Sequence, residues 1–334
     1  MSNPVLVEVT RGSVIESRHR GAISVMDADA NSVLSVGDTA RPVFARSAIK
    51  AVQALPLVES GAADAFGFGD SELALACSSH SGEDEHIEMA RSMLARAGCG
   101  EDALECGGHW STQQHVLIHQ AKTRDSEPGP LCNNCSGKHA GFICTAVHQG
   151  VDPKGYISPD HWSMETVKAA LEDVTGAAHA ENLRGTDGCS IPTYATPLTA
   201  MASGFAKMAT GHGLALERAK AAKRLLNACM AAPFYMAGTH RFCTRLMELE
   251  PGRLFGKTGA EGVYCGAIPE LGLGIALKCD DGNSRGAEVM MAATMAHLLD
   301  DDDRLQPGLH ALSNSVLTNR NELEVGHLRA TLTV

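Results

Sequence analysis

The stretch LFGKTGAEGVYCGAIPELGLGIALK, residues 254–278, contains three short runs rich in aliphatic and aromatic residues. Glycine-rich or proline-containing turns separate the runs, which predicts strands at 254–258, 262–268 and 273–278. A helical pattern follows from about 286 to 299. This stretch decides the fold, because the only other clear series of β-type runs lies at the opposite end of the chain.

The first forty residues carry that other series. Turn residues at Gly12, Gly21 and 29–31 separate its runs, which predicts an antiparallel meander with strands at 5–10, 13–17, 22–26 and 32–36. Between the two β regions, alanine-, leucine- and methionine-rich segments predict helices at 86–97, 158–174, 197–210 and 216–229. Strands at both ends with helices between them predict an α+β fold, in which a helical region is inserted into one antiparallel sheet built from the N- and C-terminal segments.

We therefore expect a single catalytic unit over residues 1–334. Its expected parts are N-terminal strands at 1–40, a mainly helical region at 41–250, C-terminal strands with a closing helix at 251–300, and a tail at 301–334 for which the sequence predicts no definite structure. The acidic run from Asp300 to Asp303 is interpreted as a solvated loop after the last helix.

Composition excludes several classes of protein. The chain has 334 residues, 44% of them hydrophobic, and 28 basic against 39 acidic residues give a net charge of −11. It should therefore fold, and its acidic balance argues against nucleic-acid or membrane-surface partners. Eleven cysteines are an odd number, so at least one thiol stays unpaired within the chain, as in a reducing compartment. With no signal-peptide pattern and no long apolar run, we expect a cytoplasmic protein with a small-molecule substrate.

The first chemical motif is Ser47-Ala-Ile-Lys50, an S-x-x-K at the start of a predicted helix. Residues three apart share a helix face, so the Lys50 amine can reach the Ser47 hydroxyl. The backbone N–H groups of a helix N-terminus can also stabilise an oxyanion. Alone, the motif is better explained by an N-capping serine and a solvated lysine.

Two later segments support the catalytic interpretation. Cys77-Ser-Ser-His-Ser81 follows a short apolar helix, and Lys257-Thr-Gly259 lies on a predicted C-terminal strand. The order S-x-x-K, serine-containing turn, K-T-G is that of serine β-lactamases and penicillin-binding proteins. The middle motif departs from the usual S-D-N, because Ser79-His-Ser81 lacks the asparagine.

Two thiol-bearing turns suggest a metal site. The segment CNNCSGKHAG, residues 132–141, combines a C-x-x-C with Lys138 and His139, and GTDGCSIP, residues 185–192, presents Asp187 and Cys189. Cysteine, histidine and aspartate ligands together favour Zn²⁺, and spacing alone favours His139 as the nitrogen ligand. The other interpretation is that these cysteines are buried free thiols.

Five segments together resemble the rhizobial-type, or class 3, L-asparaginases, whose fold is related to serine β-lactamases, penicillin-binding proteins and glutaminases. The segments are ARSAIK at 45–50, CSSH at 77–80, CSGKHAG at 135–141, DGC at 187–189 and GKTGAEG at 256–262. The resemblance runs from about Val5 to Leu299. It implies hydrolysis of L-asparagine to L-aspartate and ammonia by a cytoplasmic homodimer that holds Zn²⁺.

The resemblance also implies residue roles. Ser47 with Lys50, and Ser79 with Lys257, are similar to the family's two serine–lysine tandems. Its metal ligands correspond to Cys135, Lys138 and Cys189, so the nitrogen ligand becomes Lys138 in place of His139. A lysine ligand must lose its proton, because only the neutral amine has a lone pair. The expected substrate-binding residues are His139, Asp187, Thr258 and Gly259.

The expected chemistry is acyl transfer, in which Lys50 deprotonates Ser47 and Ser47 attacks the amide carbonyl of asparagine. Backbone N–H groups of Ser47 and near Gly259 would stabilise the oxyanion. The residues leave open that Ser79 is the nucleophile. They also leave open a glutaminase or β-lactam hydrolase of the same fold, a zinc amidohydrolase using metal-bound hydroxide, and a non-enzymatic metal-binding module.

Overall fold

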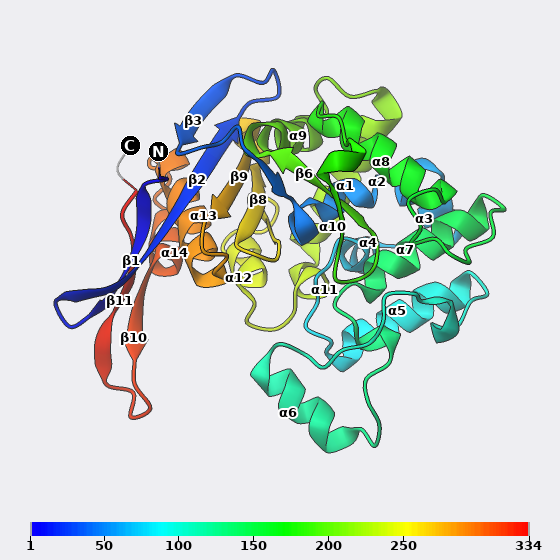
Figure 1. Ribbon diagram of the computed structural model, residues 1–334, viewed down its shortest axis with the longest axis horizontal. Coiled ribbons are helices and arrows are strands. Elements are labelled where there is room, and N and C mark those ends of the chain that lie inside the picture. Colours follow the sequence, from blue (N-terminus) through cyan, green and yellow to red (C-terminus); the bar gives the residue numbers. More distant parts are fainter. Residues whose placement is uncertain (1, 333–334) are drawn as a thin grey trace.

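The computed structural model describes residues 2–332 and contains a large antiparallel sheet built from both ends of the chain (Figure 1). The strand order is β10-β11-β1-β2-β9-β8-β7, with β3 also paired to β2. The predicted α+β fold, with helices inserted between terminal strands, is confirmed. The strands are β1 (Val5–Arg11), β2 (Val14–Met26), β3 (Ser32–Val36), β7 (Phe255–Thr258), β8 (Val263–Ile268), β9 (Leu273–Cys279), β10 (Asn314–Thr318) and β11 (Glu324–Ala330).

Strand β2 is longer than predicted, because Gly21 does not end it. The two predicted runs on either side of Gly21 form one strand whose first half pairs with β1 and whose second half pairs with β3. A Cβ atom at position 21 would lie 2.4 Å from the carbonyl oxygen of Lys278 on β9. Gly21 therefore permits the close approach of β9 within the sheet instead of marking a turn.

The C-terminal residues, for which the sequence predicted no definite structure, are ordered. Residues Gln306–Ser313 form α14, and the β10–β11 hairpin pairs with β1 in the register Val7 to Ala330 and Val9 to Leu328. At Gly326 a Cβ atom would lie 2.0 Å from the carbonyl oxygen of Thr10, so the hairpin too depends on a glycine for its close approach to β1. The hairpin covers what would otherwise be an exposed sheet edge at β1.

Helices cover both faces of the sheet. On β9, Gly274 faces α9 (Leu198–Thr210), because a Cβ atom there would meet the Ala202 carbonyl, whereas Cys279 lies against Gly286 of α13 (Ser284–Leu298). Residues 274 and 279 differ by an odd number, so they point to opposite faces. The sheet is thus a middle layer with α13 on one side and the inserted helical region on the other (Figure 1).

The inserted region holds the remaining helices and a second, three-stranded sheet that the sequence analysis missed. Proline at both ends of its central strand weakened the β signal in the sequence. In that sheet, β6 (Pro192–Pro197) lies between β4 (Pro42–Phe44) and β5 (Arg184–Thr186). The helices are η1 (Arg46–Ile49), α1 (Lys50–Gln53), α2 (Leu55–Glu59), α3 (Ala62–Ala65), α4 (Asp70–Ala76), α5 (Asp84–Arg96), η2 (Glu101–Ala103), α6 (Gln114–Thr123), η3 (Pro130–Cys132), α7 (Ser136–His148), α8 (Trp162–Thr175), η4 (Glu181–Leu183), α10 (Leu216–Ala231), α11 (Pro233–Met236) and α12 (Phe242–Glu248); η5 (Pro269–Leu271) links β8 to β9.

The helical segments are all too short or too polar for a bilayer. Within residues 2–332, we find no helix with the length and apolar character needed to cross a membrane.

Candidate active site

Two buried lysines meet at the hydroxyl of Ser79. Lys50 Nζ and Lys257 Nζ each lie 3.0 Å from Ser79 Oγ, and Lys50 also donates to Cys135 Sγ at 3.1 Å. Only 6% of Ser79 is exposed, and the lysines are 0% and 1% exposed. We call Ser79, Lys50, Lys257 and Cys135 the Ser79 centre. Within the described chain, none of its hydrogen bonds involves a carboxylate.

Sheet geometry directs Lys257 toward this centre. Lys257 on β7 pairs with Cys265 on β8, which pairs with Ala276 on β9. Side chains directly opposite one another share a face, and Ala276 is two residues from Gly274, which faces α9. Lys257 therefore points into the inserted helical region.

The segment that carries Ser79 follows α4 and is fixed against the start of α7. The His80 N–H donates to the Asn134 carbonyl at 3.2 Å, and His80 Nε2 lies 2.9 Å from Ser136 Oγ. These contacts place Ser79 beside Cys135. The turns at 77–81 and 132–141, which the sequence analysis singled out separately, thus form one structural unit.

Lys50 is not hydrogen-bonded to Ser47, contrary to the predicted contact along the helix face. Its Nζ instead donates to the Ser78 carbonyl, Ser79 Oγ and Cys135 Sγ. The spacing correctly placed both residues on one short segment, but the buried acceptors across the site draw the lysine away from Ser47. Three acceptors match the three N–H groups of an ammonium, which suits Lys50 to hold a charge rather than to accept a proton.

Lys257 is suited to accept a proton. Burial, followed by the positive charge of Lys50, lowers the pKa of Lys257 to about 7. Its Nζ also donates to the Thr258 carbonyl at 2.7 Å, which leaves the lone pair of the neutral amine free to accept the Ser79 proton. A base whose pKa lies near neutrality is the kind that general-base catalysis requires.

Ser47 lies at the edge of the site, in η1, and is half-buried. Arg46 just before it has φ 49°, in the left-handed region that residues other than glycine rarely adopt. The Arg46 side chain donates from Nε to Asp187 Oδ1 at 2.8 Å, an ion pair that holds this turn against the loop carrying Cys189. Burial opposes ionisation of Asp187, but Lys138 and Arg46 hold the pKa of its carboxyl below the usual value.

Two thiols and an amine lie together beneath Asp187. Lys138 Nζ donates to Cys189 Sγ at 3.0 Å, and Cys135 and Cys189 share a hydrogen bond. That bond, together with the charges of Lys50 and Lys138, lowers the pKa of the Cys135 thiol well below its usual value. Burial opposes the charge of Lys138, but the sulfurs of Cys189 and Cys135 raise its pKa.

This donor set fits a soft divalent metal. Two buried sulfurs and one nitrogen, from the start of α7 and from the loop that carries Cys189, converge as zinc ligands do, and the charge of Lys138 also acts on Asp187. Because the pKa of Lys138 is raised when no metal is bound, binding would have to displace its proton. The arrangement therefore accommodates the predicted ligands Cys135, Lys138 and Cys189.

Comparison with known proteins identifies the family. The family model for L-asparaginase II matches residues 7–330. The chain belongs to the L-asparaginase II family. No curated protein matches the chain. Among solved structures, it is similar to a β-lactamase from Mycobacterium bovis (14% identity, 84% of this chain and 94% of that chain covered, TM-score 0.41) and to a class C β-lactamase from Rhodobacter sphaeroides (13% identity, 84% and 94% covered, TM-score 0.40).

Two of the residues predicted to bind substrate in this L-asparaginase II family member have other roles. His139 is fully buried, and its Nδ1 lies 2.6 Å from the hydroxyl of Tyr156, so the contact indicates a structural role in α7. The Gly259 N–H donates to the Val263 carbonyl at 2.7 Å, so it is not free to stabilise an oxyanion. Gly259 instead allows β7 to approach η1, since a Cβ atom there would lie 2.9 Å from the Ala45 carbonyl.

The other two predicted substrate-binding residues lie at the site. Thr258 is half-buried directly beside Lys257, and Asp187 is paired with Arg46 and feels the charge of Lys138. Arg46 could not be recognised from the sequence, because nothing local links it to a carboxylate 141 residues later in the chain.

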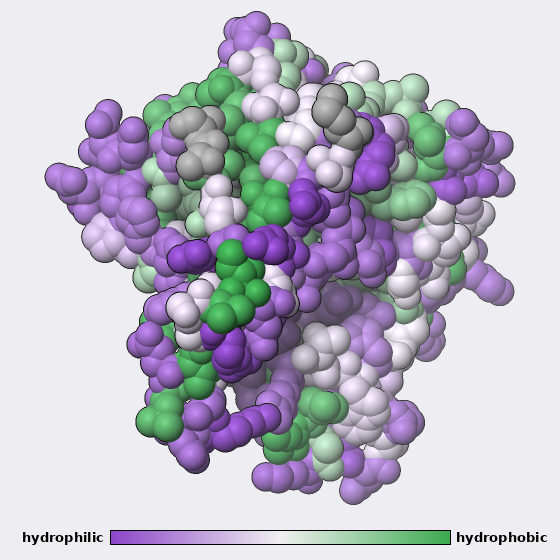
Figure 2. Space-filling view, turned by 60° about the vertical axis from the view of Figure 1, so that its left-hand side comes forward, coloured by the Kyte–Doolittle hydropathy of each residue, from purple (hydrophilic) through white to green (hydrophobic). Residues whose placement is uncertain are grey.

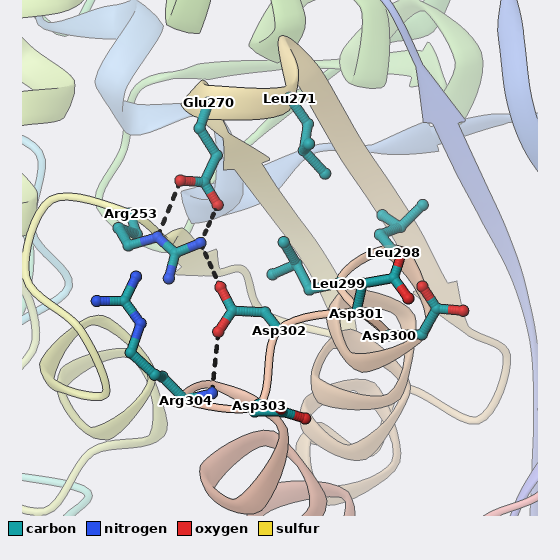
Figure 3. A pocket seen from close by; sticks show the side chains of 10 residues that line it. All are labelled: Arg253, Glu270, Leu271, Leu298, Leu299, Asp300, Asp301, Asp302, Asp303 and Arg304. Carbon is teal, nitrogen blue, oxygen red and sulfur yellow. Dashed lines mark hydrogen bonds and ion pairs between the residues drawn. The ribbon is translucent and has the colours of Figure 1, made fainter.

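An open cavity lies elsewhere. The cavity has a volume of about 520 Å³. Its lining includes three charged residues, Arg253, Glu270 and Asp302 (Figure 3). Arg253 pairs with Glu270, with Asp302 at 2.6 Å and with Glu250 at 2.9 Å; we call these four residues the Arg253 cluster. Asp302, in the acidic run interpreted as a solvated loop, is therefore an ion-pair partner.

Figure 2 shows a largely hydrophilic, hollowed face on which apolar side chains form small separate groups.

Proposed function

We propose that this member of the L-asparaginase II family hydrolyses the side-chain amide of L-asparagine to L-aspartate and ammonia through a serine acyl-enzyme. The observation that carries the proposal is the Ser79 hydroxyl between two buried lysines, one of which has a pKa near 7. A base of this kind, next to a second serine on a half-exposed turn, can run acyl transfer at neutral pH.

In the proposed mechanism Ser47 is the nucleophile. Ser47 is half-buried and accessible to substrate, whereas Ser79 is enclosed by the lysines. As Ser47 Oγ attacks the amide carbon, its proton passes to Ser79, and the Ser79 proton passes to neutral Lys257. This relay requires Ser47 Oγ and Ser79 Oγ to come within hydrogen-bond distance when substrate is bound. Lys50 remains an ammonium that stabilises the charge developing on Ser79.

The reaction then continues through three further relayed proton transfers. The oxyanion forms near the Ser47 N–H, which belongs to the first turn of η1 and has no carbonyl acceptor within that helix. Protonated Lys257 returns its proton through Ser79 to the leaving nitrogen, so that ammonia departs and an aspartyl ester of Ser47 remains. Water then attacks the ester while its proton passes through Ser79 to Lys257, and Lys257 returns that proton through Ser79 to the departing Ser47 oxygen, which restores both the hydroxyl and the neutral amine.

Zinc bound by Cys135, Lys138 and Cys189 would supply a fixed positive charge that orients the polar end of the substrate. Neither the attack nor the proton relay uses it, which separates this mechanism from that of a zinc hydrolase. Asp187 would provide the negative counterpart, since its carboxyl is held ionised beside Arg46.

Two further expectations come with the family. We infer that the protein acts as a homodimer and in the cytoplasm. All eleven cysteines are free thiols and ten of them are buried, which suits a reducing compartment. Light scattering at two protein concentrations would test the dimer, and a single-chain mass at both would contradict it.

Ammonia release is the direct test of activity. The protein, with and without a chelator, is incubated separately with asparagine, glutamine and a chromogenic β-lactam. We expect turnover of asparagine. Turnover of only glutamine or only the β-lactam would contradict the assigned substrate, and complete loss with chelator while Ser47→Ala stays active would indicate a zinc hydrolase.

The nucleophile is tested by trapping the ester. Rapid acid quench and peptide mass spectrometry should place the aspartyl group on the peptide containing Ser47. Ser47→Ala should remove both ester and turnover. Ser79→Ala should lower kcat by roughly 10²- to 10⁴-fold while still forming ester on Ser47. An ester on the Ser79 peptide would reverse the two roles.

A further inference from the structure

Arg241 stands beside the Ser79 centre without an acidic partner. Its Nη1 contacts the carbonyl oxygen of Ser79 at 3.5 Å, the outer limit of a hydrogen bond, and the side chain is half-buried. A guanidinium has five N–H donors, so most of them remain unused. Within residues 2–332 Arg241 forms no ion pair, whereas other half-buried arginines, such as Arg218 and Arg253, each pair with two or more carboxylates.

The loop that carries Arg241 is fixed to the segment that carries Ser79. The Ser79 N–H donates to the Met236 carbonyl at 3.1 Å, and Thr239 donates from both N and Oγ1 to the Glu83 carboxylate, at 2.8 and 2.6 Å. Gly238 has φ 117°, and a Cβ atom there would lie 2.7 Å from Glu83 Oε1, so a side chain would break this contact. The position of Arg241 relative to Ser79 is therefore built into the fold.

The surroundings of Arg241 carry an excess of positive charge. Lys50, Lys257 and Arg241 lie around Ser79, and Arg241 helps to lower the pKa of Lys257, so that Lys257 is neutral above about pH 7 and the positive charge resides on Lys50 and Arg241. The nearby carboxyl of Glu288 does not offset this charge by an ion pair, and burial raises its pKa to about 7 in spite of Arg241 and Arg245. An anionic group of the substrate would complete the charge balance next to the serine.

We propose that Arg241 binds the α-carboxylate of the substrate and so restricts the enzyme to free α-amino acids. This rests on the proposed function, because asparagine is the substrate whose carboxylate needs a partner. Only two carbons separate that carboxylate from the side-chain amide, so the group that binds it must lie close to the two serines of the relay, and Arg241 contacts the backbone of one of them, Ser79. Arginine binds carboxylates through two parallel hydrogen bonds, which also fixes the orientation of the ligand.

With the α-carboxylate bound to Arg241, the α-ammonium group of the amino acid lies on the opposite side of the site. The α-ammonium group then faces the carboxylate of Asp187, while the amide faces Ser47. Three different contacts define one orientation of an L-amino acid. A ligand with a neutral α-carboxamide loses the Arg241 contact alone, which provides a chemical probe of this residue.

The test compares Arg241→Gln, Arg241→Lys and a matched control, Arg245→Gln, an exposed arginine one turn later on α12. Each is assayed with L-asparagine and with its α-amide, L-asparaginamide. For Arg241→Gln, we expect KM for asparagine to rise roughly 10- to 100-fold with little change in kcat, and kcat/KM for asparaginamide to stay the same. Arg241→Lys should recover part of the loss, and Arg245→Gln should match the unmodified protein.

Two outcomes would overturn the assignment. One is an equal loss on both substrates, which indicates a structural role. The other is an unchanged KM for asparagine. If the unmodified protein releases no ammonia from asparagine, the proposed function fails, but Arg241 is still tested by calorimetric binding of L-aspartate. Weaker binding in Arg241→Gln than in Arg245→Gln supports the assignment, and equal binding overturns it.

Discussion

The Ser79 centre and the Arg253 cluster are both dense in charged groups, but they differ in their access to water and to opposite charge. In the Arg253 cluster, partly exposed carboxylates surround one guanidinium at the edge of an open cavity (Figure 3). In the Ser79 centre, two buried lysines meet one hydroxyl and one thiol, with no carboxylate among their hydrogen-bond partners in the described chain.

The difference explains which group of residues is reactive. Paired charges near water keep their ordinary protonation and contribute modestly to stability. A buried ammonium without a counter-charge is unfavourable, so its pKa falls, as that of Lys257 does, to about 7. In this protein the reactive group is an amine that is buried without an opposite charge. The size of a cavity does not indicate where such a group lies.

The largest expected effect follows from replacing Lys257 with methionine. This change keeps the volume and removes the base, so kcat/KM for asparagine should fall roughly 10²- to 10⁴-fold. The midpoint of thermal unfolding should stay the same or rise, because a buried amine is replaced by an apolar group. Enzyme assays and calorimetry measure the two quantities.

The matched control is Lys223→Met, at an exposed position on α10, for which both quantities should be unchanged. A Lys257→Met protein with normal turnover would show that the Ser79 centre is as inert as the Arg253 cluster.

Removal of a thiol should have the next largest effect. In Cys189→Ala, the affinity for zinc should fall more than roughly 100-fold, because a direct ligand is lost. KM for asparagine should rise more than kcat falls, since the metal orients the substrate. Metal content by mass spectrometry and the chelator dependence of thermal unfolding check this, with Cys99→Ala, a thiol outside the site, as control. Zinc retained by Cys189→Ala would remove Cys189 from the ligand set.

The pH dependence should reveal the free base form of Lys257. Since only the neutral amine accepts a proton, kcat/KM should rise about tenfold per pH unit below 7 and level off above it. Stability should also rise with pH between about 7 and 10.5, because the unfolded chain binds the lysine proton there and the folded chain does not. The stability slope should be shallower in Lys257→Met. A kcat/KM profile that is flat below pH 7 would contradict the assignment.

The sequence predicted the members of the Ser79 centre, and the resemblance predicted the pairing of Ser79 with Lys257, but not the contact of Lys50 with Ser79. Short motifs identify residue types at fixed local spacing, and Lys50, Ser79, Cys135 and Lys257 each lie in one. The spacing of Ser47 and Lys50 could not reveal that Lys50 contacts Ser79 and not Ser47. The acceptors of Lys50 belong to a loop 28 or more residues later. Arg241 lies in no motif, and only the tertiary structure brings it to Ser79.

The same holds for the fold. Apolar runs predicted the strands at 254–278, because buried strands must be apolar in sequence. The β10–β11 hairpin has the burial pattern of an exposed edge, with alternate residues in water, so its composition resembles that of a loop. Its pairing with β1 joins the two ends of the chain, and local sequence does not encode such a distant contact.

The smallest effect is expected for the Arg253 cluster. It tests whether paired charges near water contribute only modestly to stability and nothing to turnover. In Arg253→Ala, three ion pairs are lost: one lies within the loop before β7, and the other two join that loop to η5 and to the turn before α14. Each is partly exposed, so the free energy of unfolding should fall by only about 1 kcal/mol and the unfolding temperature by about 2 °C. Turnover of asparagine should not change. Urea unfolding and ammonia release measure both, with Arg224→Ala, which removes one exposed pair with Asp64, as the milder control. A loss of turnover without a loss of stability would mean that the open cavity takes part in the reaction, and that desolvation alone does not separate the reactive charges of this protein from its structural ones.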